Sequence, residues 1–147
     1  MAENKAKHEE ILSHYYALAG LGYAEHKLGQ DNRAVQHLGQ ALSLVTKTSA
    51  MAAHSLSLHA LLAIALLLVD RGEVERAVEL YALACRYPFV ANSRWYEDVA
   101  GKHITAAAAT MPPEFVAAAQ ERGRARNLET TMKELLAELE QNTEAHE

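Results

Sequence analysis

The feature that most constrains this 147-residue chain is an internal repeat, whose copies are placed by Ala34 and Ala77, 43 residues apart. In each copy a glycine precedes an Ala-Val pair by five residues, a large residue follows that alanine by four, and another alanine follows it by seven. The glycines are Gly29 and Gly72. Glycine ends a helix readily because the left-handed conformation costs it little. The pattern therefore predicts two helix–turn–helix segments in which small alanines let the helices approach closely.

The composition favours helices over strands throughout the chain. It contains 28 alanines and 20 leucines, but only 11 residues that are valine or isoleucine. Alanine and leucine are among the strongest helix formers, whereas β-branched residues suit the pleated surface of a sheet. We therefore expect an all-α fold.

Glycines, prolines and polar clusters divide the chain into about seven helical segments of ordinary length. The expected helices span about 4–28, 32–45, 49–70, 74–86, 92–110, a segment that starts at the Pro112-Pro113 pair, and 128–140. Residues 87–91 are expected to form a loop. The expected N-caps are Ser49, either Asn92 or Ser93, and Asn127, because their side-chain oxygens accept a backbone N–H that the helix leaves unpaired.

The repeat resembles the tetratricopeptide repeat (TPR), a helix–turn–helix unit that stacks into a solenoid. Gly22, Ala34, Leu38 and Ala41 match the family's small and large positions. The copies are further apart than the family's usual period of about 34 residues, and Leu18 stands where the family has an aromatic residue. The resemblance implies a TPR-like α-solenoid of antiparallel helical hairpins with long repeats.

A chain of 147 residues is expected to form a single domain, residues 1–147. The expected parts are a first unit at about 4–46, a second at about 49–90, a degenerate third at about 92–126, a capping helix at about 127–141, and a polar tail at 142–147. In the third unit, the apolar residues expected to pack are Trp95, Tyr96, Val99 and Ile104 in the first helix and Phe115, Val116 and Ala119 in its partner.

The expected capping helix is amphipathic, as the end of a solenoid requires. One apolar stripe follows the helical period, through Leu128, Met132, Leu135, Leu136 and Leu139. The charged residues are expected to form a polar outer face, made of Glu129, Lys133, Glu134, Glu138 and Glu140.

Long repeats of this kind resemble the C-terminal sensor array of large bacterial signalling ATPases and multidomain transcription regulators. Residues 79–101 look like the last units of such arrays. The resemblance implies a non-catalytic interaction or effector-sensing module that binds a protein, a peptide or a small effector in a concave groove. The alternative is a structural end-cap of a longer array with its ligand site elsewhere. In that case, an exposed repeat end would favour a homodimer.

In the TPR family, the first helix of each unit lines the groove. The family's groove positions fall here on Tyr16, Tyr23, His26, Lys27, His59, Leu62, Leu66 and Asp70. The first four combine aromatic surface with polar tips, as binding surfaces do. Leu62 and Leu66 form either an apolar groove floor or ordinary core, because a helix this apolar is usually buried on most sides.

No pattern in the sequence indicates catalysis, a metal site or a cofactor. His8 and His14 are six residues apart, and His54 and His59 are five apart, whereas a helical zinc-binding pair needs a spacing of four. Cys85 stands where the second copy calls for a small packing residue, so we expect it to be buried and unreactive.

Charge and hydropathy further narrow the expected partners. The net charge of -5, with no concentrated basic face, argues against direct nucleic-acid binding. The basic run at 122–126 is flanked by acids and is expected to be a solvated turn.

A single cysteine fits a reducing, cytoplasmic location. The longest apolar run, 56–69, is shorter than the roughly 20 residues of a membrane span, so we expect a buried helix and no membrane contact.

Overall fold

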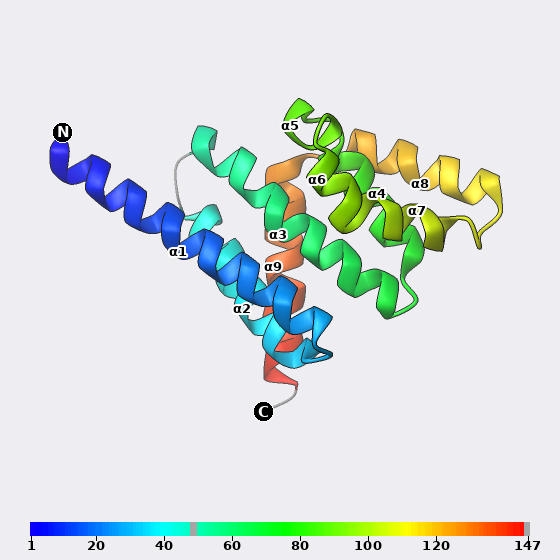
Figure 1. Ribbon diagram of the computed structural model, residues 1–147, viewed down its shortest axis with the longest axis horizontal. Helices are drawn as coiled ribbons and strands as arrows, with labels where there is room; N and C mark the ends of the chain where they lie inside the picture. The colour runs from blue at the N-terminus through cyan, green and yellow to red at the C-terminus, as the bar shows by residue number, and fades with distance from the viewer. Residues whose placement is uncertain (48–49, 146–147) are drawn as a thin grey trace. The chain divides into compact units, whose positions relative to one another are not determined.

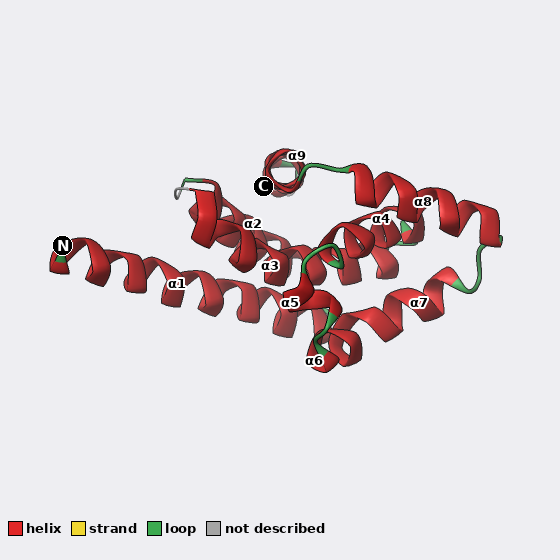
Figure 2. Ribbon diagram, turned by 90° about the horizontal axis from the view of Figure 1, so that it is seen from above, coloured by secondary structure: helices red, strands yellow, loops and turns green. Residues whose placement is uncertain are grey.

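The structure, a computed structural model, describes residues 1–47 and 50–145, and the side chains of residues 50–56 lie outside this description. Within the described residues the chain is helical, with short connections and no strand (Figure 2). The predicted all-α class is therefore confirmed. The expected N-cap Ser49 lies outside the described residues. No helix in the part of the chain that was searched is long and apolar enough to cross a membrane.

The helices follow one another along the chain as Figure 1 labels them. They are α1 (Ala2–Lys27), α2 (Asp31–Thr46), α3 (Ala50–Asp70), α4 (Val74–Ala84), α5 (Pro88–Ala91), α6 (Arg94–Tyr96), the π-helical turn η1 (Glu97–Gly101), α7 (Lys102–Ala108), α8 (Pro113–Ala125) and α9 (Leu128–Glu144). The first four lie close to the ranges expected from the sequence.

The region after α4 differs from the expectation. The expected loop at 87–91 contains the short helix α5, which has Pro88 in its first turn. Proline stops a preceding helix, but its fixed φ angle also suits the first turn of a new one. The expected helix at 92–110 is present without a break from Arg94 to Ala108, as α6, the π-helical turn η1 and α7. Its expected cap is confirmed at Ser93, whose Oγ accepts a hydrogen bond from the Tyr96 N–H at 3.3 Å.

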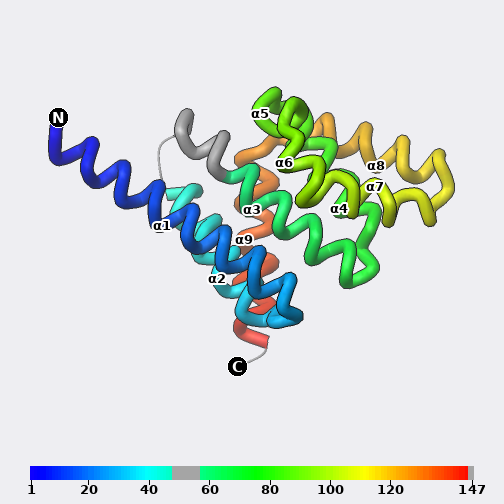
Figure 3. Tube along the Cα trace, in the orientation of Figure 1, coloured from blue at the N-terminus to red at the C-terminus, as the bar shows by residue number. Residues whose placement is uncertain are grey.

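The chain forms two compact units, which we describe separately. Unit 1 comprises Met1–Ala60 and Thr131–Glu147, and unit 2 comprises Leu61–Thr130. In the trace of Figure 3, unit 1 holds the two ends of the colour range and unit 2 holds its middle. The helices α3 and α9 each contribute residues to both units.

The core of unit 1 lies where α1 packs against α2. A Cβ atom at Gly22 would lie 2.6 Å from Cγ of Leu38, so the glycine leaves the space that the buried leucine fills. Tyr15 of α1 is fully buried, and its hydroxyl accepts a hydrogen bond from the Ala60 N–H at 3.1 Å. The small and large positions of the first sequence copy are therefore helix-packing positions.

The helix α9 has the expected apolar stripe. Its members Leu128, Met132, Leu135 and Leu139 are buried, and Leu136 is half-buried. The expected polar face is exposed at Glu129, Lys133, Glu134, Glu138 and Glu140. The Thr130 N–H donates to Oδ1 of Asn127 at 3.0 Å, which confirms the expected cap.

The two repeated glycines form turns of the same geometry. Gly29 has a φ of 74° and Gly72 has a φ of 80°, both in the left-handed region. The Gly29 N–H donates to the carbonyl oxygen of His26, and the N–H of the following residue donates to the carbonyl oxygen of Glu25. In the same way, the Gly72 N–H donates to the carbonyl oxygen of Val69, and the N–H of the following residue donates to the carbonyl oxygen of Leu68. Each turn is the Schellman type of helix end, in which glycine avoids the steric cost of a side chain.

In unit 2, α4 packs against α7 and α8. A Cβ atom at Gly123 would lie 2.2 Å from the carbonyl oxygen of Glu79 and 2.9 Å from Cβ of Ala82, so α8 approaches the backbone of α4. On the other side of α4, a Cβ atom at Gly101 would lie 2.3 Å from the hydroxyl oxygen of Tyr81. Glycines therefore set both close approaches to α4.

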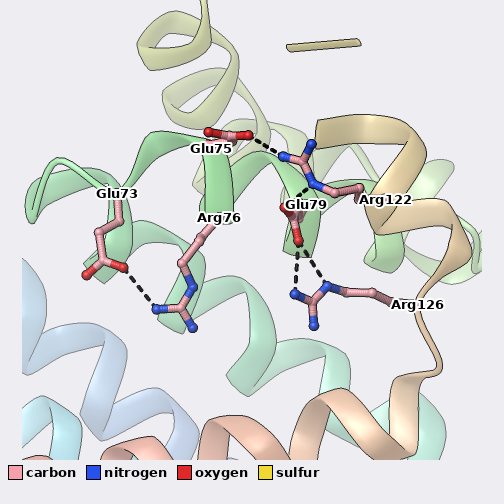
Figure 4. Close-up of polar contacts among 6 residues, drawn as sticks. All are labelled: Glu73, Glu75, Arg76, Glu79, Arg122 and Arg126. Atoms are coloured by element: carbon pink, nitrogen blue, oxygen red, sulfur yellow. Dashed lines mark hydrogen bonds and ion pairs between the residues drawn. The ribbon is translucent and has the colours of Figure 1, made fainter. Parts of the chain in front are cut away.

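The sequence suggested that the basic run at 122–126 is a solvated turn. Instead, the run forms the last turn of α8 and the residue after it. Arg122 Nε donates to Glu79 Oε1 at 2.7 Å, and Arg126 Nε donates to Glu79 Oε2 at 3.0 Å (Figure 4). Arg122 also pairs with Glu75. Glu79 is buried, so its charge needs these partners, and the acids that pair with Arg122 and Arg126 lie on α4.

Two aromatic residues expected to pack in the third unit are instead exposed. Trp95 is 54% exposed and Phe115 is 53% exposed, whereas Ile104 and Ala119 are buried as expected. The ring of Trp95 contacts the buried Tyr96 edge to face, with centroids 4.9 Å apart. The buried residues Tyr96, Ala100, Ile104 and Ala108 recur every four positions from α6 to α7, and Trp95 lies outside this stripe.

Candidate functional site

Two of the expected groove residues meet in unit 1. The ring of Tyr16 in α1 contacts the ring of His59 in α3 edge to face, with centroids 5.7 Å apart. Tyr16 remains 47% exposed, and His59 is half-buried. Burial lowers the pKa of His59 below its usual value, which favours the neutral ring at pH 7. The pair therefore leaves aromatic surface exposed on unit 1.

The other groove residues of unit 1 lie near the end of α1. Lys27 Nζ is 5.6 Å from the ring centroid of the half-buried Tyr23, within the range of a cation–π contact. His26 is only 7% exposed, and its Nδ1 lies 3.0 Å from Asp31 Oδ1. His26 therefore takes part in the helix–helix packing, while Tyr23 and Lys27 remain accessible.

The last three expected groove residues lie in unit 2. Leu62 and Leu66 are buried, with 3% and 4% of their surface exposed. Asp70, the final residue of α3, is exposed. Ordinary core residues are buried to this extent. The two leucines therefore fit the interpretation as core rather than the interpretation as a groove floor.

A cavity that none of the expected groove residues lines lies within unit 2. It is a cleft of about 710 Å³ between α4, α7 and α8, a size typical of small-molecule sites. Its apolar wall includes Val78, Ile104, Met111 and Val116. The sequence did not predict this cleft, because the expected groove lies on the first helix of each repeat.

The cleft exists because short side chains line it. Four of its lining residues are alanines, at Ala82, Ala108, Ala109 and Ala117. The close approaches at Gly101 and Gly123 hold α4 against the helices on either side, while the alanines do not fill the space between them. The space is therefore bounded by closely packed helices whose facing side chains are short.

Cys85 and Tyr81 lie together on the α4 wall of the cleft. A hydrogen bond to Tyr81 lowers the pKa of the Cys85 thiol, but burial outweighs it and raises this pKa above the usual value. Burial and the neighbouring Cys85 raise the pKa of Tyr81 to about 12. Both groups are therefore neutral at pH 7. The sequence expectation of an unreactive cysteine agrees with this direction, although Cys85 is only half-buried.

The charges that line the cleft are all positive. They are Arg86 of the α4 C-terminal segment and Arg124 of α8, and none of the described lining residues is acidic. Arg86 Nη1 donates to the carbonyl oxygen of Arg126 at 2.9 Å. Arg124 pairs with the exposed Glu121 at 2.8 Å.

No metal-binding cluster was found among the described residues, where three or more His, Cys, Asp or Glu side chains would have to converge. Comparisons of the chain with protein-family models, with curated protein sequences and with solved structures find no match.

Proposed function

We propose that the chain is a non-catalytic binding module built from TPR-like repeats, in which antiparallel helical hairpins stack as a short solenoid and α9 caps it. Its partner is a protein or peptide, or a small effector. The module would form the C-terminal part of a bacterial signalling ATPase or transcription regulator. There, ligand capture would shift the equilibrium between closed and assembled states.

The observation that carries this proposal is the agreement between the two glycine turns. Gly29 and Gly72 share the left-handed φ and the same two hydrogen bonds. The alanines that follow at the repeated positions, Ala34 and Ala77, are both fully buried. A chain in which sequence spacing, turn geometry and burial repeat together is typical of a repeat protein.

The accessible groove residues of unit 1 support a partner that has aromatic or acidic side chains. Tyr16 and Tyr23 offer rings, and Lys27 offers a cation beside one of them. Tyrosine is enriched at interfaces because it buries a large surface at a low entropic cost. We therefore assign the partner surface to Tyr16, Tyr23, Lys27 and His59.

A displayed library of random peptides tests this surface. We expect the full chain to select peptides whose affinity falls at least about tenfold in Tyr16→Ala or Tyr23→Ala, because interface tyrosines often contribute more than about 1.4 kcal/mol. Phe115→Ala is the matched control, since it removes an equally exposed ring from unit 2. Circular dichroism would show that each variant folds. An empty selection, or peptides that bind both tyrosine variants unchanged, would contradict the assignment.

The proposed parent protein has a separate test. The gene that encodes the chain should carry a nucleotide-binding domain upstream in the same reading frame. A reading frame that stops on both sides of these residues would contradict this part of the proposal and leave the binding function standing.

The alternative function, a structural end-cap of a longer array, is favoured by a different observation. Leu21 of α1 and Leu28, the residue that follows α1, are 47% and 73% exposed, and a preceding repeat would cover them. Such a surface favours self-association. Light scattering should then show a dimer that Leu21→Glu converts to a monomer. A wild-type chain that stays monomeric at every concentration would rule against this alternative.

A further inference from the structure

The cleft of unit 2 is a separate feature from the groove surface of unit 1, and it combines an apolar wall with positive charge. Its volume of about 710 Å³ suits a small molecule, and Met111, Val116 and Ala117, which are only partly buried or exposed, contribute apolar surface to it. A ligand that buries an alkyl chain there gains about 0.8 kcal/mol for each methylene group removed from water.

The charge of the cleft is opposite to that of the whole chain. The chain has a net charge of -5, yet the charged side chains that line the cleft are Arg86 and Arg124. Within the described part of the chain, no acidic side chain pairs with Arg86, which uses one donor on the carbonyl of Arg126. A guanidinium group has further N–H donors in a fork that matches a carboxylate. Arg124 adds a second positive charge, already shared with Glu121.

We propose that the cleft between α4, α7 and α8 binds a medium-chain alkyl carboxylate. The alkyl chain lies along the wall formed by Met111, Val116 and Ala117, and the carboxylate accepts hydrogen bonds from Arg86, with Arg124 contributing long-range attraction. This site goes beyond the interaction surface proposed for unit 1, and no residue of that surface takes part in it.

The single cysteine of the chain gives a direct readout of occupancy, because Cys85 lines the cleft. The probes are decanoate, decanol and decylamine, used below their micellar concentrations with the full chain. N-ethylmaleimide is added at pH 8.5, since burial raises the pKa of the Cys85 thiol. We expect decanoate to slow alkylation at least about tenfold at saturation, decanol to slow it less, and decylamine to leave it unchanged. Equal protection by decanoate and decylamine, or no protection by decanoate, would overturn the proposal.

Variants then test the role assigned to Arg86. Isothermal titration calorimetry should show that Arg86→Gln weakens decanoate binding at least about tenfold, the effect of losing a charge-assisted hydrogen bond. Arg86→Lys keeps the charge and should retain part of the affinity. Arg94→Gln is the control, because Arg94 is an exposed cation of unit 2 that does not line the cleft.

Unchanged decanoate affinity in a folded Arg86→Gln variant would overturn the proposal. If Arg86→Gln does not fold, the three probes on the wild-type chain still decide between the outcomes. Tyr16→Ala provides the comparison with the groove surface: it should leave decanoate binding intact, so failure of one proposal is distinguishable from failure of the other.

Discussion

Replacing Gly123 by alanine tests the closest helix–helix approach in unit 2. The new Cβ atom would lie 2.2 Å from the carbonyl oxygen of Glu79, whereas real Cβ atoms essentially never approach another atom within 3.0 Å. The obstacle is the backbone of α4, which cannot rotate away as a side chain can. The backbone of α8 must therefore withdraw by roughly 1 Å, and a gap of that size forfeits a quarter to a half of the attraction between the facing atoms.

The expected cost follows from two opposing effects. Overpacking of this kind costs roughly 1–3 kcal/mol, and the upper end applies because the obstacle is backbone. Alanine also has a higher helix propensity than glycine, which stabilises the variant by at most about 1 kcal/mol. We therefore expect a net loss of about 2 kcal/mol in the free energy of unfolding. In a chain of this length, such a loss lowers the melting temperature by roughly 4–8 °C.

Urea and thermal unfolding followed by circular dichroism at 222 nm would measure this loss. Gly20→Ala is the matched control, because Gly20 lies within α1 and a Cβ atom there would have no neighbour within 4 Å. That variant should gain about 0.5–1 kcal/mol from propensity alone. If Gly123→Ala is as stable as the wild type while Gly20→Ala shows its gain, the close approach of α8 to α4 is refuted.

Three further predictions concern turns, ion pairs and pH. Gly29→Ala and Gly72→Ala should each lower the free energy of unfolding by about 1 kcal/mol, because both positions are left-handed, and equal stability to the wild type in urea melts would contradict the turn geometry. Glu79→Gln should lower the urea midpoint, because it weakens the pairing with Arg122 and Arg126, whereas Glu73→Gln should change it little, since Glu73 is exposed where it pairs with Arg76 (Figure 4). The folded-state pKa of Tyr81 is about 12 against 10.0 for the free side chain, so the folded state retains this proton longer and stability should fall as the pH rises from 10 to 12. Tyr81→Phe should show a smaller fall than the wild type in urea melts across that range, and an equal fall would argue against the shift.

The sequence determined the local structure because helix ends and packing positions depend on neighbouring residues. Gly29 and Gly72 predicted their helix ends, since few other residues adopt that backbone conformation. Asn127 predicted a cap from its side chain alone. The expectation failed at Pro88, where proline's two roles, stopping one helix and starting another, give the same sequence signal.

Only the tertiary structure decided which side chains meet across the chain. Arg122 and Arg126 looked solvated because their neighbours in sequence are acidic, yet they pair with Glu79, more than 40 residues away. The cleft was equally invisible, since its alanines have the same sequence signature as alanines that pack tightly. Whether an alanine closes a contact, as Ala77 does, or leaves a space, as Ala117 does, depends on the separation of the helices. Gly101 and Gly123 set that separation in unit 2 through contacts that local patterns do not encode.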